Sequence, residues 1–296
     1  MSSNVTAVSY GINLSPSQVE QVRRSLAGAG LALGSENTAG DGRYSVYSVD
    51  CTLPGALTSA GLAELRRSIA GIDGVDIAVV PAVLRRAPRK LLIMDVDSTL
   101  IKQEVIELLA AYAGKREEVT AVTEAAMRGE LDFAQSLHAR VAVLAGLPAD
   151  VVDSVRAEVT LSDGAAELVA AFKAAGHAVA VVSGGFNQVL RPIAERLGLD
   201  HWIANELEIS DGALTGKVVG DVVDRAAKEK YLREWAAAEG IPMEHTIAVG
   251  DGANDLDMLG AAGIGVAFNA KPAVRAAADA AINMSYLDAV RHIAGV

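Results

Sequence analysis

The sequence predicts two domains of different class. The first is an α+β domain of ferredoxin-like βαββαβ order, and the second is an α/β domain whose doubly wound, mostly parallel, Rossmann-like sheet carries a helical cap insert. The chain has 296 residues, about two ordinary domain lengths, and strand patterns alternate with helix patterns along it. Its charge is also uneven, since residues 1–90 hold 9 Lys and Arg against 7 Asp and Glu, whereas residues 91–296 hold 17 against 30. We expect domains at 1–85 and 86–296, with the cap at about 102–175.

The N-terminal segment alternates between strand and helix patterns. Ser15 followed by Pro16 opens a helix, because serine caps a helix and proline fits its first turn. Gly40-Asp41-Gly42 marks a turn between two strands. The expected elements are a strand at 5–10, a helix at 15–29, strands at 31–36 and 44–51, a helix at 57–69 and a strand at 75–81. The basic segment 85–90 is expected to be a solvated connector, with docking on the acidic second domain as the alternative.

The second domain begins with a buried strand and continues with helices. Helical patterns fill residues 102–175, and strand patterns resume at 177, so a helical insert separates the first two strands. The expected helices of the insert are 104–113, 117–128, 133–145 and 149–158. The expected strands are 90–94, 177–182, 201–204, 246–249 and 264–267, with a hairpin at 206–220. Ligands of open α/β sheets bind beyond the carboxyl ends of the strands, where this insert would form a roof.

Composition narrows the class of protein. The net charge of −11 argues against a general nucleic-acid or anionic-membrane partner. The single cysteine, Cys51, cannot form an internal disulfide, which is typical of a reduced compartment. We therefore expect a cytoplasmic location.

Two strand ends carry paired carboxylates. Asp95 and Asp97 directly follow the apolar run 91–94, and Asp251 and Asp255 follow the apolar run 246–249. At about 4 Å and an effective dielectric near 20, each ionised pair costs on the order of 4 kcal/mol. A single aspartate at a strand end is often only an Asx turn, but four on converging strands predict a bound dication. Such a sparse oxygen site suits Mg²⁺.

Two further sequence features are weaker evidence for a functional site when each is taken alone. Ser183-Gly184-Gly185 follows an apolar strand, so its hydroxyl and backbone N–H groups could cradle a phosphate, although the same residues also make ordinary turns. Lys228 lies in a charged helix pattern, where most lysines are solvated.

Taken in order, these motifs resemble those of the haloacid dehalogenase superfamily of phosphotransferases. The resemblance implies that Asp95 is the nucleophile that becomes an aspartyl phosphate and that Asp97 is the general acid and base. It also implies that Mg²⁺ is held by the Asp95 carboxylate, the Asp97 carbonyl and Asp251, with Asp255 orienting the site. The phosphate-side positions are Ser183, Gly184, Lys228 and Asn254.

Within that superfamily, the insert resembles that of the phosphoserine phosphatases, which catalyse the last step of serine biosynthesis. The resemblance implies that Glu104 recognises the ammonium of O-phospho-L-serine and Arg140 its carboxylate, while Met127 and Phe133 shape the pocket. Opposite charges of this kind suit a zwitterion. An ion pair within the cap is the alternative.

The N-terminal domain resembles ACT-type modules in element order alone. Two roles remain open for it, binding of an amino-acid effector and packing or homodimer formation. Two rival functions also remain: a related phosphatase or phosphotransferase acting on another small phosphomonoester, and an amino-acid-sensing regulatory protein with a vestigial site.

Overall fold

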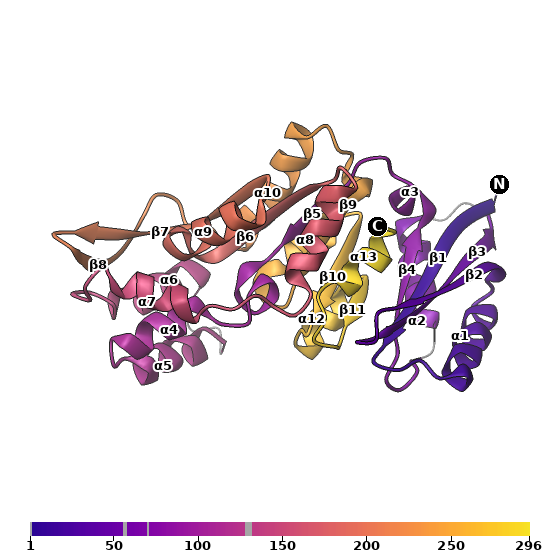
Figure 1. Ribbon diagram of the computed structural model, residues 1–296, viewed down its shortest axis with the longest axis horizontal. Helices are drawn as coiled ribbons and strands as arrows, with labels where there is room; N and C mark the ends of the chain where they lie inside the picture. The colour runs from indigo at the N-terminus through magenta and orange to yellow at the C-terminus, as the bar shows by residue number, and fades with distance from the viewer. Residues whose placement is uncertain (1, 56–57, 70, 128–131) are drawn as a thin grey trace.

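The computed structural model describes residues 2–55, 58–69, 71–127 and 132–296, and the side chains of these residues except 2, 3 and 124–127. It confirms the predicted fold class. A four-stranded antiparallel sheet and a seven-stranded, mostly parallel sheet lie at successive positions along an elongated molecule (Figure 1). No helix in these residues is long and apolar enough to cross a membrane.

The N-terminal sheet has the strand order β2-β3-β1-β4. Its elements are β1 (Ser2–Gly11), α1 (Pro16–Gly28), β2 (Ala32–Gly40), β3 (Ser45–Pro54), α2 (Ser59–Ser68) and β4 (Asp76–Pro81). Helix α1 begins at the predicted place because Ser15 and Gln18 form a capping box. One face of the sheet packs on α1 and α2, with Val22 and Leu26 of α1 in that core.

The second sheet has the strand order β11-β10-β9-β5-β6-β7-β8, and only β7 and β8 run antiparallel. Its strands are β5 (Leu91–Met94), β6 (Ala178–Phe186), β7 (His201–Ser210), β8 (Ala213–Val219), β9 (Thr246–Gly250), β10 (Ile264–Phe268) and β11 (Ala280–Ile282). The predicted hairpin is β7–β8, and Asp211 and Gly212 have positive φ at its turn. The three-residue edge strand β11 was not predicted.

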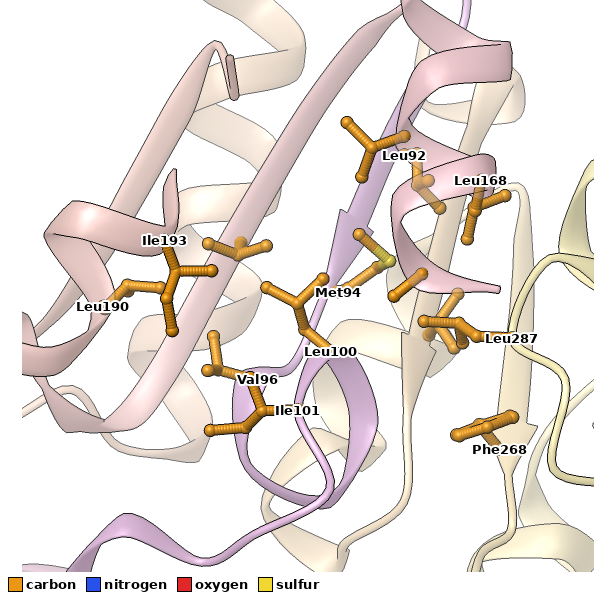
Figure 2. Packing of buried hydrophobic residues seen from close by; sticks show 14 of the residues in the cluster. Leu92, Met94, Val96, Leu100, Ile101, Leu168, Leu190, Ile193, Phe268 and Leu287 are labelled. Carbon is orange, nitrogen blue, oxygen red and sulfur yellow. The ribbon is translucent and has the colours of Figure 1, made fainter. Parts of the chain in front are cut away.

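Helices cover both faces of this sheet. The helices are α8 (Ala165–Ala174), α9 (Asn187–Leu197), α10 (Arg225–Ala238), α11 (Leu256–Ala261), α12 (Pro272–Ala277) and α13 (Ala289–Ala294). Strand β5 is buried on both faces. On one face Leu92 and Met94 pack with Leu168 of α8 (Figure 2). Leu91 and Ile93 point to the other face, into the core that α10, α11 and α12 share.

The insert between β5 and β6 contains α4 (Val105–Tyr112), α5 (Arg116–Met127), α6 (Phe133–Ala142) and α7 (Val151–Glu158). These helices gather beside the β7–β8 hairpin, at the end of the molecule away from the N-terminal sheet (Figure 1). The backbone N–H of Gly146 donates to the Leu214 carbonyl at 2.8 Å, and the N–H of Leu214 donates to the Leu147 carbonyl at 2.8 Å. The hairpin and the insert are therefore one packed unit.

The basic connector is docked, so the expectation of a solvated segment was wrong. It begins at Arg85, the last residue of the short helix α3 (Ala82–Arg85), and the Arg85 guanidinium donates to the carbonyls of His292 and Ile293 at the end of α13. Arg89 pairs with Glu239. The reason is that the free carbonyls at a helix C-terminus attract cations.

The second face of the N-terminal sheet packs against the other domain. Tyr44 is buried there; its hydroxyl donates to Asp288 Oδ2 at 3.0 Å, and its ring stacks on Tyr286 at 5.6 Å. Arg43 reaches the same Asp288 oxygen at 2.6 Å, and the Tyr10 hydroxyl donates to the Ala281 carbonyl at 2.7 Å. The two sheets thus share one buried interface.

Candidate active site

The candidate site lies at the carboxyl ends of the neighbouring parallel strands β5 and β9. The N–H of Asp95 donates to the Val249 carbonyl at 2.9 Å, which aligns the end of β5 with the end of β9. Asp95 then begins the turn η1 (Val96–Leu100), and its Oδ1 accepts the N–H of Val96 at 2.6 Å. The carboxylate of Asp95 is thereby fixed above the sheet edge.

Lys228, on α10, connects the two acidic motifs. Its Nζ lies 2.8 Å from Asp95 Oδ1 and 2.7 Å from Asp255 Oδ1, and its side chain is fully buried. Burial alone would lower the pKa of Lys228, but the two carboxylates outweigh it and hold the pKa above its ordinary value. Lys228 is therefore a charged group of the site, and the alternative of a solvated lysine was wrong.

The acidic residues could hold a metal ion. One carboxylate oxygen from each of Asp95, Asp251 and Asp255 lies within 4.8 Å of the others. Burial and the neighbouring Asp255 raise the pKa of Asp251 to about 6 and that of Asp95 well above its usual range. Lys228 alone therefore leaves uncompensated negative charge. A set of hard oxygen ligands that is mostly buried and has surplus negative charge fits a hard dication.

Two glycines and a threonine hold the carboxylates of this cluster in place. A Cβ at Gly250 would overlap the Asp255 carboxylate, so only glycine allows the strand end to approach it. The N–H of Gly252 donates to Asp255 Oδ2 at 3.0 Å. The Thr99 hydroxyl donates to Asp251 Oδ1 at 3.1 Å, a contact that sequence reasoning missed.

Asp97 lies beside the cluster in a different environment. Its Oδ2 accepts the N–H of Val105 at 3.4 Å, while its buried Oδ1 has no hydrogen-bond partner among the described residues. Burial, aided by the charge of Glu104, raises the pKa of Asp97 to about 8. The raised pKa favours the protonated form, which is the form that a general acid needs.

The end of β6 forms a narrow loop opposite Asp97. Ser183 Oγ accepts the N–H of Gly185 at 2.8 Å. A Cβ at Gly185 would lie 3.0 Å from Ser183 Oγ and 3.1 Å from Asp97 Oδ2, so a side chain here would press on both oxygens. A Cβ at Gly184 would lie 2.9 Å from the ring of Phe133, which places that ring of the insert over the loop.

Asn205, at 2% exposure, was not among the predicted site residues. Its Nδ2 donates to the Gly184 carbonyl at 2.8 Å, and its Oδ1 accepts the N–H of Val223 at 2.8 Å. It therefore joins the loop of Ser183 to the segment that leads into the helix of Lys228. A polar residue within the strand pattern of β7 is the sequence signal that could have found it.

The insert places charged groups over the acids. Glu104 directly precedes α4, and the half-buried Arg140 of α6 donates from Nε to the Ser136 carbonyl at 3.2 Å. Burial lowers the pKa of Arg140, although Glu104 and Asp97 act in the opposite direction. No Glu104–Arg140 ion pair is present among the described residues.

Two other predicted residues lie elsewhere around the site. Met127 ends α5, but its side chain lies outside the described part of the chain. Asn254 is half-buried in the turn η3 (Ala253–Asp255).

Residues 92–260 match the haloacid dehalogenase-like hydrolase family. The chain is 58% identical to a phosphoserine phosphatase of Streptomyces coelicolor over 254 residues, which are 86% of this chain and 62% of that protein. It is 54% identical to phosphoserine phosphatase SerB2 of Mycobacterium tuberculosis over 228 residues, 77% of this chain and 56% of that protein. The chain thus spans less than two thirds of these two relatives. A Streptococcus thermophilus phosphoserine phosphatase is 51% identical over 185 residues, 62% of this chain and 86% of that protein.

Solved structures share the arrangement. A phospho-aspartyl intermediate analogue of phosphoserine phosphatase superimposes with a TM-score of 0.66 at 44% identity, covering 69% of this chain and 98% of its own. An unliganded probable phosphoserine phosphatase from Vibrio cholerae gives 0.75 at 37% identity, covering 98% of this chain and 87% of its own. Similarity to the latter therefore includes the N-terminal domain as well as the acidic site.

Proposed function

The chain belongs to the haloacid dehalogenase-like hydrolase family, and from this premise we propose that it is a phosphoserine phosphatase, hydrolysing O-phospho-L-serine to L-serine and inorganic phosphate. In the cell this reaction would be the last step of serine biosynthesis. The observation that carries the proposal is the close assembly of the buried Asp95, Lys228 and Asp255 with the half-buried Asp251, beside Asp97, whose pKa is raised.

Two aspartates would carry the chemistry. An Asp95 oxygen attacks phosphorus and forms a phosphorus–oxygen bond, while the bond from phosphorus to the serine oxygen breaks and its electron pair stays on that oxygen. Asp97 gives its proton to the departing oxygen, so L-serine leaves as the alcohol. Asp97 then accepts a proton from a water that attacks the aspartyl phosphate, which returns Asp95 and releases phosphate.

The remaining polar groups would bind the phosphoryl oxygens. Ser183 and Gly184 offer a hydroxyl and a backbone N–H, Asn254 lies on the same side, and Lys228 neutralises charge on Asp95 and the phosphate. Mg²⁺, held by the carboxylates of Asp95 and Asp251 and the carbonyl of Asp97, with Asp255 orienting them, would neutralise the transferring group.

The insert would select the substrate. Arg140 would pair with the substrate carboxylate and Glu104 with its ammonium, while Phe133 and Met127 close the pocket. Phe133 supports this assignment, because its ring occupies the space next to Gly184 that a Cβ there would need.

The domain division at 85 and 86, with the cap at about 102–175, belongs to the same proposal, as do a cytoplasmic location and the lack of nucleic-acid or membrane partners. The single cysteine is a buried free thiol, which suits a reduced compartment. For residues 1–85 we propose a regulatory or dimerising role, with an amino acid as the effector in the first case.

The decisive experiment measures phosphate release from O-phospho-L-serine with Mg²⁺ and again with excess chelator. Two further substrates test the insert: O-phosphoethanolamine lacks the carboxylate, and 3-phosphonooxypropanoate lacks the ammonium. We expect Mg²⁺-dependent release and a clear preference for the zwitterion. A preference for either truncated substrate would refute the roles of Glu104 and Arg140, and release unaffected by chelation would refute the metal.

A further inference from the structure

Ser98 has a backbone conformation that serine adopts at a cost. Its φ is 56° and its ψ is 5°, in the left-handed region. Among the described residues, the only other non-glycine residues with positive φ are Asp211 and Asn269, whose residue types tolerate this region best. Glycine would fit position 98 without strain. A serine here therefore suggests a use for its hydroxyl.

The hydroxyl contacts a charged group of the insert. Ser98 Oγ donates to Glu104 Oε1 at 2.6 Å, and the N–H of Ser98 donates to the Gln103 carbonyl at 3.3 Å. Within the part of the chain that the structure describes, no other side chain donates a hydrogen bond to Glu104. The turn that follows the nucleophile thus holds the residue that precedes the first helix of the insert by a charge-assisted hydrogen bond.

The electrostatic surroundings explain why Glu104 needs such a bond. Its charge contributes to the raised pKa values of Asp97 and Asp251, so its carboxylate lies near enough to the acidic cluster to interact with it. Like charges repel it from this place, and Arg140 attracts it from α6. A half-buried glutamate without a tether would rotate away from the acids towards water.

We propose that Ser98 is a positioning residue: it holds the Glu104 carboxylate at the amine end of the substrate pocket and so sets the preference for phosphomonoesters that carry an ammonium group. This inference rests on the proposed function and deepens it. Ser98 itself touches none of the reacting atoms; it acts through Glu104.

A purely structural role for Ser98 makes a different prediction. If the hydroxyl only stabilised the turn, its loss would lower activity on every substrate by the same factor, and Ser98→Gly, which removes the backbone strain, would perform better than Ser98→Ala. If the hydroxyl positions Glu104, both variants lose the same discrimination, because both lack the donor.

The test compares kcat/KM for O-phospho-L-serine and for 3-phosphonooxypropanoate, which differ only in the ammonium. In Ser98→Ala and Ser98→Gly we expect the ratio of the two kcat/KM values to fall about tenfold, because a hydrogen bond to a charged group is lost. The fall should come mainly from a higher KM for O-phospho-L-serine. Glu104→Gln should abolish the same preference, and adding Ser98→Ala to it should change the ratio little further. Ser68→Ala, which removes a hydroxyl bonded to the Leu65 carbonyl in the N-terminal domain, is the control.

The outcomes separate the two proposals. A wild-type protein that releases no phosphate from O-phospho-L-serine refutes the proposed function. A wild-type protein that prefers O-phospho-L-serine, together with a Ser98→Ala variant that keeps the full ratio, overturns only the inference about Ser98. Recovery of the ratio in Ser98→Gly would also overturn it.

Discussion

The ammonium of Lys228 lies 2.7 Å from Asp255 Oδ1, and neither side chain is exposed to solvent. The same ammonium contacts Asp95, so one buried cation holds the residue that would attack phosphorus against the residue that orients the metal site. Removing one member of such a buried group leaves charge without compensation.

Lys228→Met should therefore reduce both activity and stability. We expect kcat/KM to fall by at least about 100-fold, because a preorganised cation at the phosphoryl group is lost. The free energy of unfolding of the metal-free protein should fall by about 3–5 kcal/mol. Lys230→Met is the control, since Lys230 is an exposed lysine of the same helix. A Lys228→Met variant with activity within threefold of wild type would contradict the assignment.

Asp95→Asn should stop catalysis without unfolding the protein. The amide oxygen can still accept from Val96 and Lys228, but it cannot act as the nucleophile, so phosphate release should fall by at least about 1,000-fold. Circular dichroism and chemical denaturation should show a native fold. Asp257→Asn, which changes an acid that pairs with Arg225 at the surface, should stay active. Substantial turnover by Asp95→Asn would remove Asp95 from the nucleophilic role.

The metal-free protein should lose stability as the pH rises. The pKa values of Asp97 and Asp251 are raised to about 8 and about 6, above the unfolded value of about 4. The folded state therefore binds more protons than the unfolded state between these limits. The stabilisation is complete below about pH 4 and is lost as the pH rises to about 8.

Urea denaturation at pH 5 and pH 8 measures this effect. We expect a decrease on the order of a few kcal/mol without metal, and a smaller decrease with saturating Mg²⁺, which would take the place of the protons. Equal stability at the two pH values without metal would show that the acids are not forced together in solution.

Asn205→Asp should weaken phosphate binding while sparing the fold. The carboxylate still accepts from Val223, but it no longer donates to the Gly184 carbonyl and adds negative charge behind the phosphate loop. We expect KM to rise about tenfold for all phosphomonoesters tested, and the inhibition constant of inorganic phosphate to rise equally. This lack of substrate selectivity distinguishes Asn205 from Ser98. An unchanged phosphate inhibition constant would mean that Asn205 has no influence on the loop.

The sequence predicted those parts of the site that lie within one segment. Asp95 and Asp97, like Asp251 and Asp255, follow apolar strands, and parallel strands bring their carboxyl ends together. Thr99 and Asn205 could not be assigned in this way, because their roles depend on which loops the topology makes neighbours. Ser98 was inconspicuous for another reason, since its unusual φ is visible only in the backbone.

The fold was predicted to a similar degree. Long periodic helices and apolar strands were found in their places, whereas β11 was missed because its sequence, Ala-Ala-Ile, has no period to detect. The connector was misjudged because Arg85 and Arg89 bind carbonyls that lie 208 and 150 residues later in the chain.

The shared interface between the two sheets also affects how the protein denatures. Val8 and Tyr44 of the first domain and Leu287 and Val290 beside the second sheet belong to one continuous core, and each is at most 2% exposed. Neither domain can open without bringing apolar surface of the other into water. We accordingly expect heating to unfold the chain in one cooperative transition. The N-terminal domain, which contributes no catalytic group, then raises the melting temperature of the catalytic domain.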